Sequence, residues 1–154
     1  MLEKSRKMLE NEINEKLKNV KDYQGSYAID ELKNVEIKTF PSFFVVNLDK
    51  RSGIGNHWIA FAVYPIHVFI CDSLGGIIPD DSFPIQLVNF LYLLTFRRSI
   101  CMTKQLQPLS SLFCGKYSVL FIKQMSKDNS FSSFLKLFTN NYMQNDTIVT
   151  FLSE

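Results

Sequence analysis

The sequence predicts a single α+β domain that spans residues 1–154. Three observations support this prediction. Short apolar runs typical of strands follow one another in the first half of the chain, and segments of helical length lie before and after them. No internal repeat, low-complexity tract or Pro/Ser-rich linker divides the chain. The expected order of elements is therefore helix, strands, helix, strand and helices.

The first predicted element is an amphipathic helix near the N-terminus. Its apolar residues recur at steps of three, four and seven among Lys, Glu and Asn: Leu2, Leu9, Ile13, Leu17 and Val20. One face of this helix is expected to pack on the domain. The next stretch, KDYQGSYAIDEL, contains Gly25 and a potential helix cap at Asp30, and is interpreted as a loop that leads into a short helical turn.

Three adjacent antiparallel strands are predicted after Pro41. The runs SFFVVNLD, HWIAFAVY and HVFICD are dense in β-branched and aromatic residues, and are separated by the polar turn KRSGIGN and by a break at Pro65. After a turn at Gly75 and Gly76, PIQLVNFLYLLTF has the length and apolar periodicity of a helix, with Pro84 where a helix can begin. The run SICMTKQ is interpreted as a further strand.

The last third of the chain is expected to be helical. CGKYSVLFIKQM is apolar on nearly every side and predicts a buried helix that begins at Cys114. FSSFLKLFTNNY and DTIVTFL are expected to follow as helices, the second of them capped at Asp146.

Composition limits the classes of function. A formal net charge of +2 argues against a strong nucleic-acid-binding surface. No apolar stretch reaches the roughly 20 residues that span a bilayer, and the charged start MLEKSRKMLENE is unlike a signal peptide. We therefore expect a soluble, intracellular, monomeric protein without a membrane partner.

The three cysteines, Cys71, Cys101 and Cys114, show no paired C-x-x-C spacing. An odd number of cysteines without such pairs fits neither a disulfide framework nor a zinc site. Free thiols in a reducing compartment are expected, with no metal and no required cofactor.

Cysteine-based nucleophilic chemistry needs a thiolate, a base, a group that orients the base, and donors for the oxyanion. Cys114 lies where the polar loop QPLSSLF meets the start of the predicted buried helix, whose N-terminus stabilises negative charge on sulfur. Viewed alone, Cys114 fits a small packed residue better than a nucleophile. The residues around it have to decide between the two interpretations.

His57 is the candidate base. It begins a strand directly after a glycine-containing turn and before Trp58, so its ring can project at a strand edge. The other histidine, His67, alternates onto the same strand face as Phe69 and Cys71. We interpret His67 as structural or solvent-facing.

Asp72 and Gln107 are candidates for the two remaining roles. Asp72 closes the strand after that of His57, so an antiparallel pair would bring the two residues together. Alone, Asp72 fits a turn-forming aspartate equally well. Gln107 precedes Cys114 by seven residues, and its side-chain amide could join the Cys114 N–H in an oxyanion hole.

These motifs resemble those of the adenovirus protease, or adenain, family: G-N-H-W from Gly55 to Trp58, the acidic Asp72, and Q-P-L-S-S-L-F-C-G from Gln107 to Gly115. The similarity extends weakly from about Gly25 to the C-terminus. The related proteases that process ubiquitin-like proteins share these residues but usually place the glutamine six residues before the cysteine. Spacing therefore favours the viral branch. The sequence departs from the family in having Asp rather than Glu at the acidic position and no Pro-Asn run before Cys114.

The resemblance implies a papain-like cysteine protease fold of the adenain type. A central mixed or antiparallel sheet would carry a buried helix that starts at the nucleophilic cysteine, with further helices packed around it. It also implies a Cys114–His57–Asp72 triad with Gln107 in the oxyanion hole. The implied function is cleavage of precursor and capsid proteins of a virus or virus-like element during particle maturation, in the cytoplasm or nucleus of a host cell and in the virion.

Members of this family are stimulated by a short peptide that forms a disulfide with a strand cysteine, and Cys101 lies in a similar place. Cys101 also fits a buried strand cysteine without such a role. Two alternatives to the main interpretation stay open. One is a deconjugating protease for ubiquitin-like modifiers, and the other is a non-enzymatic binding module with the protease fold.

Overall fold

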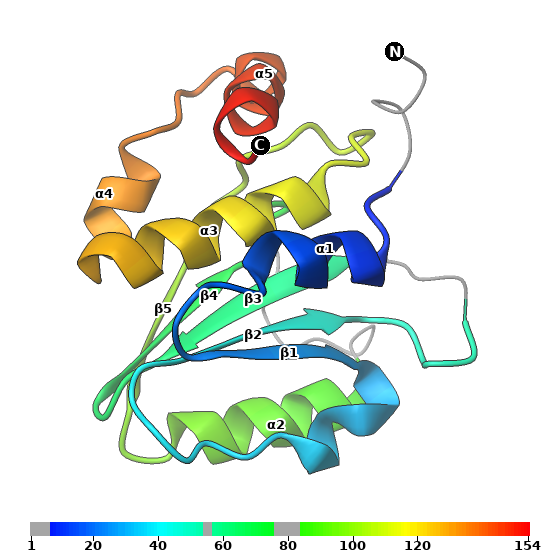
Figure 1. The fold of residues 1–154 in the computed structure, drawn as a ribbon, viewed down its shortest axis with the longest axis vertical. Helices are drawn as coiled ribbons and strands as arrows, with labels where there is room; N and C mark the ends of the chain where they lie inside the picture. The colour runs from blue at the N-terminus through cyan, green and yellow to red at the C-terminus, as the bar shows by residue number, and fades with distance from the viewer. Residues whose placement is uncertain (1–6, 54–56, 76–83) are drawn as a thin grey trace.

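The computed structural model describes residues 7–53, 57–75 and 84–154. It contains a five-stranded mixed sheet with helices on both faces, which confirms the predicted α+β class (Figure 1). The strands, in sheet order, are β1 (Tyr23–Ala28), β2 (Ser42–Asn47), β3 (Trp58–Val63), β4 (His67–Cys71) and β5 (Ser99–Met102). The helices are α1 (Glu10–Leu17), the 3-10 helix η2 (Ile29–Asn34), α2 (Ile85–Thr95), α3 (Cys114–Asp128), α4 (Phe131–Leu135) and α5 (Tyr142–Leu152).

The central three strands are antiparallel, as predicted. β2 pairs with β3 and β3 pairs with β4, while the outer strands β1 and β5 run parallel to their neighbours. Every residue of β2 and β3 is buried. These strands are apolar along their whole length because helices cover both faces of the sheet.

Two hydrophobic layers sandwich the sheet. α1 and α3 pack on one face, where Val45 and Ala60 point, and α2 covers the opposite face, where Phe44 and Phe61 stack with ring centroids 5.0 Å apart (Figure 1). α4 and α5 lie beside α3 on the first face (Figure 1). The predicted buried helix beginning at Cys114 is thus α3, held between the sheet and the other helices.

β1 corrects the prediction that residues 21–28 form a loop. Gly25 has a φ of +120°, and the register of β1 against β2 shifts between Tyr23 and Ser26. The glycine that suggested a loop therefore lies at a bulge within a strand, where an extra residue bends the chain without ending the pairing. The short helical turn expected after this stretch is present as η2.

Three predicted helices have different limits in the structure. α1 begins at Glu10, so Leu9 precedes the helix and Val20 follows it, while Leu2 lies outside the described residues. α4 ends at Leu135, well before residue 142. α5 is capped by the side chain of Asn141, which accepts from Gln144 N, and Asp146 is an interior residue of that helix.

None of the helices in the described part of the chain is both long and apolar enough to cross a lipid bilayer.

Candidate active site

The N-terminus of α3 meets the start of β3 at Cys114. The thiol is buried, with 3% of the residue exposed, and the main-chain N–H of Trp58 donates to its Sγ at 3.4 Å. The neighbouring Gly115 packs tightly against the segment before α1, since a Cβ there would lie 2.8 Å from the Cβ of Met8. The sulfur is therefore enclosed by α3, β3 and the N-terminal segment.

His57 and Asp72 lie side by side at the ends of neighbouring strands. His57 immediately precedes β3, Asp72 immediately follows β4, and the antiparallel pairing brings His57 Nε2 to 2.6 Å from Asp72 Oδ1. The ring also lies close enough to the Cys114 thiol for each group to shift the pKa of the other. The imidazole thus interacts with both the carboxylate and the thiol.

The two groups shift each other's pKa. Burial disfavours the charged form of both. For His57 this is outweighed by the hydrogen bond to Asp72 and by the interaction with Cys114, and for Cys114 it is outweighed mainly by the interaction with His57. The pKa of His57 rises from its ordinary 6.5 to about 9, and the pKa of the Cys114 thiol falls below its ordinary 9.0. The arrangement therefore favours a thiolate–imidazolium pair, the form in which cysteine is a nucleophile.

Asp72 is fixed by Thr103, the residue after β5, and by the main chain of the turn that follows Asp72. The Thr103 hydroxyl donates to Asp72 O at 2.7 Å and accepts from Asp72 N at 2.9 Å. Leu74 N donates to the carboxylate at 3.1 Å, and Gly75 N donates to Asp72 O at 2.8 Å. Asp72 therefore both forms a turn and contacts the His57 ring, so the two interpretations of this residue are compatible.

Gln107 is buried at the start of the segment that leads into α3, with 1% of the residue exposed. Its Oε1 accepts from Ser73 Oγ at 2.5 Å, and its Nε2 donates to Ser111 O at 3.1 Å. The preceding carbonyl, Leu106 O, accepts from Asn145 Nδ2 at 2.9 Å, which ties this segment to α5. A continuous set of contacts runs from Cys114 through His57 and Asp72 to the neighbouring Ser73 and on to Gln107.

Other residues that the sequence singled out lie apart from these contacts. His67 is exposed on β4, with Nδ1 2.6 Å from Ser99 Oγ. Cys101 is a half-buried free cysteine on β5, paired in register with Phe69. Gly55 and Asn56 of the G-N-H-W motif, and Gly76, lie outside the described residues. Within residues 7–53, 57–75 and 84–154, no group of His, Cys, Asp and Glu could hold a metal ion.

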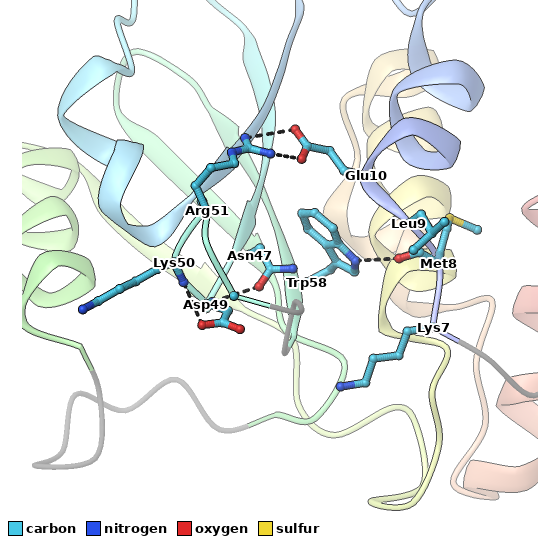
Figure 2. Close-up of a pocket in the computed structure, with 11 residues that line it drawn as sticks. Lys7, Met8, Leu9, Glu10, Asn47, Asp49, Lys50, Arg51 and Trp58 are labelled. Atoms are coloured by element: carbon cyan, nitrogen blue, oxygen red, sulfur yellow. Dashed lines mark hydrogen bonds and ion pairs between the residues drawn. The ribbon is translucent and has the colours of Figure 1, made fainter.

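A cavity of about 220 Å³ lies on the far side of Trp58, between the segment 7–10 and the turn after β2. Trp58 Nε1 donates to Met8 O at 3.0 Å, and Arg51 forms an ion pair with Glu10 (Figure 2). Arg51 forms a second ion pair with Glu31. Trp58 links this cavity to Cys114, since Trp58 lines the cavity and its main-chain N–H contacts Cys114 Sγ.

Ser73, Thr103 and Met8 were not selected from the sequence. A serine after an aspartate is typical of a turn, and a threonine near a strand end is ordinary. Their contacts to Gln107, Asp72 and Trp58 join segments far apart in the chain. The position of Ser73 directly after Asp72 is the only signal that the sequence carries for them.

Comparison with known proteins shows that this chain is similar in fold to several solved structures. No protein-family model and no curated protein matches the sequence. Among solved structures, the central domain of the uncharacterized Lpg1148 protein from Legionella pneumophila matches with a TM-score of 0.56 and 11% identity, over 96% of this chain and 94% of that one. The identity is low, so this match concerns the fold alone.

Two other similar structures are the ASFV pS273R protease, with a TM-score of 0.45 and 19% identity over 72% of this chain, and AvrA with IP6 and CoA, with a TM-score of 0.49 and 16% identity over 88%. This chain spans 43% of the first and 53% of the second.

Proposed function

We propose that the protein is a cysteine endopeptidase in which Cys114 is the nucleophile, His57 the base and Asp72 the orienting carboxylate. The observation that carries the proposal is the buried imidazole, which is bonded to Asp72 at 2.6 Å and lies close enough to the Cys114 thiol for each to shift the pKa of the other. A lone packed cysteine needs no such partners. The combination of nucleophile, base and orienting group is the arrangement that activates a thiol for acyl transfer.

The reaction begins when the Cys114 thiolate attacks the carbonyl carbon of a peptide bond and forms a C–S bond. The carbonyl electrons move to oxygen, and then return as the C–N bond breaks. The His57 imidazolium gives its proton to the leaving amine. Water, deprotonated by His57, attacks the resulting thioester, and the carboxylic acid and free thiol are released.

The oxyanion of the tetrahedral intermediate needs donors that are in place before the reaction. Cys114 is the first residue of α3, where main-chain N–H groups have no partner within the helix. The Gln107 amide carries two N–H bonds, and its bond to Ser111 O uses one of them. Each such donor contributes about 3 kcal/mol to transition-state stabilisation in comparable sites.

We further propose that the substrates are precursor and capsid proteins processed during particle maturation. The support is the adenain-like pattern of His57-Trp58, Asp72 and Gln107 seven residues before Cys114-Gly115. The cavity lined by Trp58 (Figure 2) is the place that we propose for substrate residues. A peptide that activates the enzyme through a disulfide at Cys101 belongs to the same proposal, since that thiol is free and half-buried on β5.

The first test compares Cys114→Ala with the wild-type protein. We expect the variant to keep its circular dichroism spectrum and to lose hydrolysis of peptide substrates, because only the sulfur is removed at a helix start. Cys101→Ala is the matched control, since it removes a thiol away from the site, and it should hydrolyse the same peptide at the wild-type rate in the absence of an activator. Peptidase activity that survives in the Cys114 variant would contradict the assignment.

A second experiment separates the substrate classes. Mass spectrometry of capsid precursors mixed with the purified protein should reveal specific cleavage products. A ubiquitin-like modifier that carries a C-terminal electrophile should leave Cys114 unlabelled. Rapid labelling by that probe, without precursor cleavage, would identify a deconjugating protease instead. Inertness of the thiol to iodoacetamide at neutral pH would indicate a non-enzymatic module.

A further inference from the structure

The side-chain amide of Gln107 is held at both ends. Ser111 O can only accept, so the atom 3.1 Å from it must be the NH₂ nitrogen of the amide. The other end is then the carbonyl oxygen, and Ser73 Oγ, 2.5 Å away, must be its donor. The direction in which the amide points is therefore fixed by chemistry rather than by shape, because the two ends of an amide are nearly equal in size.

The main chain and the side chain of Ser73 make separate contacts. Ser73 O accepts from Leu106 N at 2.8 Å and from Gln107 N at 3.1 Å, which fixes where the Gln107 backbone lies. Among the residues that the structure describes, the Ser73 hydroxyl bonds only to the Gln107 amide. Both Ser73 and Gln107 are 1% exposed, so bulk water does not reach this bond. A change that removes only the hydroxyl leaves the backbone contacts in place and leaves the amide held at its NH₂ end alone.

We propose that Ser73 is a positioning residue for the oxyanion hole: its hydroxyl binds the Gln107 carbonyl oxygen and so directs the Gln107 NH₂ group toward the reacting carbonyl. This inference rests on the proposed peptidase function. Since Ser73 follows Asp72 directly, two consecutive residues at the end of β4 would orient the base and the oxyanion donor respectively. Without the hydroxyl, the amide keeps only its bond to Ser111 O, and its NH₂ group is held less firmly toward the developing negative charge.

Ser73→Ala tests this role through reactions that differ in their need for an oxyanion hole. Peptide hydrolysis builds an oxyanion, whereas alkylation of Cys114 by iodoacetamide does not. We expect kcat for peptide hydrolysis to fall roughly 10- to 100-fold, less than for complete removal of a donor, while KM and the alkylation rate stay within about twofold. Binding of a peptide aldehyde, which forms an oxyanion-like adduct, should weaken in parallel with kcat.

A double-mutant cycle supplies the specific control. If Ser73 acts only through Gln107, Ser73→Ala should have no further effect on kcat in a Gln107→Ala background. Ser73→Thr, which keeps a hydroxyl, should retain most of the wild-type kcat. Thermal unfolding of each variant shows whether it is folded, and the threonine variant keeps the test usable if the alanine variant is not.

Three results would overturn the inference: wild-type kcat in Ser73→Ala, equal losses in hydrolysis and alkylation, or a full additional loss in the double variant. These results differ from failure of the proposed function, which would show as hydrolysis that does not depend on Cys114.

Discussion

At the scale of single residues, the most informative pair is Cys114 and His57. Both are buried, and burial by itself favours the uncharged form of each. Their contact reverses that preference, because a thiolate beside an imidazolium satisfies both charges. Asp72 adds a second anionic neighbour to the ring. The active form should therefore exist between the lowered pKa of the thiol and the raised pKa of the imidazole.

Asp72→Asn should lower kcat roughly 100-fold and move the alkaline limb of the pH profile downward. The carboxylate raises the pKa of His57, which lies at about 9 in the wild-type protein. The ion pair is lost as pH rises through that value, so removing the carboxylate makes the loss begin at lower pH. The measurement is kcat/KM against pH for both proteins.

His67→Ala is the control for this prediction. His67 is exposed and bonds to Ser99, so its loss should leave the pH profile unchanged. An unshifted alkaline limb in Asp72→Asn, or a shifted one in His67→Ala, would contradict the role of His57 as the base.

Four residues of the candidate site, Cys114, His57, Asp72 and Gln107, could be predicted from the sequence. The type of each residue suits one chemical role, and their spacing along the chain suggests that they lie close together. The structure brings Cys114, His57 and Asp72 together, and contacts through Ser73 extend to Gln107. Their catalytic roles remain predictions. Ser73 could not be identified, since its contribution is a hydrogen bond to a residue 34 positions away, and a serine in a turn gives no sign of a distant partner.

At the scale of elements, the turn after β4 connects Asp72, the partner of His57, with the segment that carries Gln107. Gly75 has a φ of +71°, and a Cβ at this position would lie 2.1 Å from Gln105 N. The backbone of residues 103–107 therefore passes directly against the backbone of Gly75, where there is no space for a side chain. Any side chain here must push apart the two segments that hold Asp72 and Gln107.

Gly75→Ala should lower the free energy of unfolding by about 2 kcal/mol or more, from the strained backbone and the clash combined. It should also lower kcat, because Gln105 is two residues from Gln107. The measurements are urea unfolding and peptide hydrolysis. Gly25→Ala is the matched control: its φ is also positive, but no atom lies within 4 Å of the added methyl. That variant should lose stability without losing kcat per folded molecule, and an equal loss of kcat in both variants would refute this account.

The elements that were predicted best from the sequence are those marked by a long run of apolar residues. β2, β3 and β4 are continuous apolar runs, and α3 is long and apolar. β1 was missed because Gly25 suggests a loop, and its place in a bulge depends on pairing with β2, which is not a local property. The cap of α5 was misplaced for a similar reason: Asp146 is a plausible cap, yet its carboxylate accepts from Tyr117 OH at 2.8 Å instead.

At the scale of the whole molecule, the candidate site is shared between two layers. Cys114 belongs to the helix layer, while His57 and Asp72 belong to the sheet. The nucleophile and its base therefore come together only when α3 is docked on the sheet. Next to Cys114, Gly115 packs against Trp58 of β3 and against Met8 and Ile13 of the N-terminal segment and α1.

Gly115→Ala should disturb this docking. The added methyl would lie 2.8 Å from Met8 Cβ, so the helix start must shift, and overpacking of this kind costs about 1 to 3 kcal/mol of stability. We expect a lower unfolding temperature and a slower alkylation of Cys114 by iodoacetamide. Slower alkylation would follow from a weaker contact between the thiol and His57.

Ser118→Ala is the control for this variant. Ser118 lies buried on the same helix, and its hydroxyl has no hydrogen-bond partner among the described residues. Its loss should leave stability and alkylation close to those of the wild type. If Gly115→Ala alkylates as fast as Ser118→Ala, the site does not depend on a tight fit between the two layers.

The contact between Trp58 and Cys114 also gives the protein a built-in optical reporter. Trp58 is the only tryptophan in the sequence, and its main-chain N–H lies 3.4 Å from the sulfur while its indole N–H is bonded to Met8 O. Emission excited selectively in the indole therefore originates beside the thiol and nowhere else in the chain. Stopped-flow fluorescence should follow acylation and deacylation of Cys114 in real time, without any attached dye.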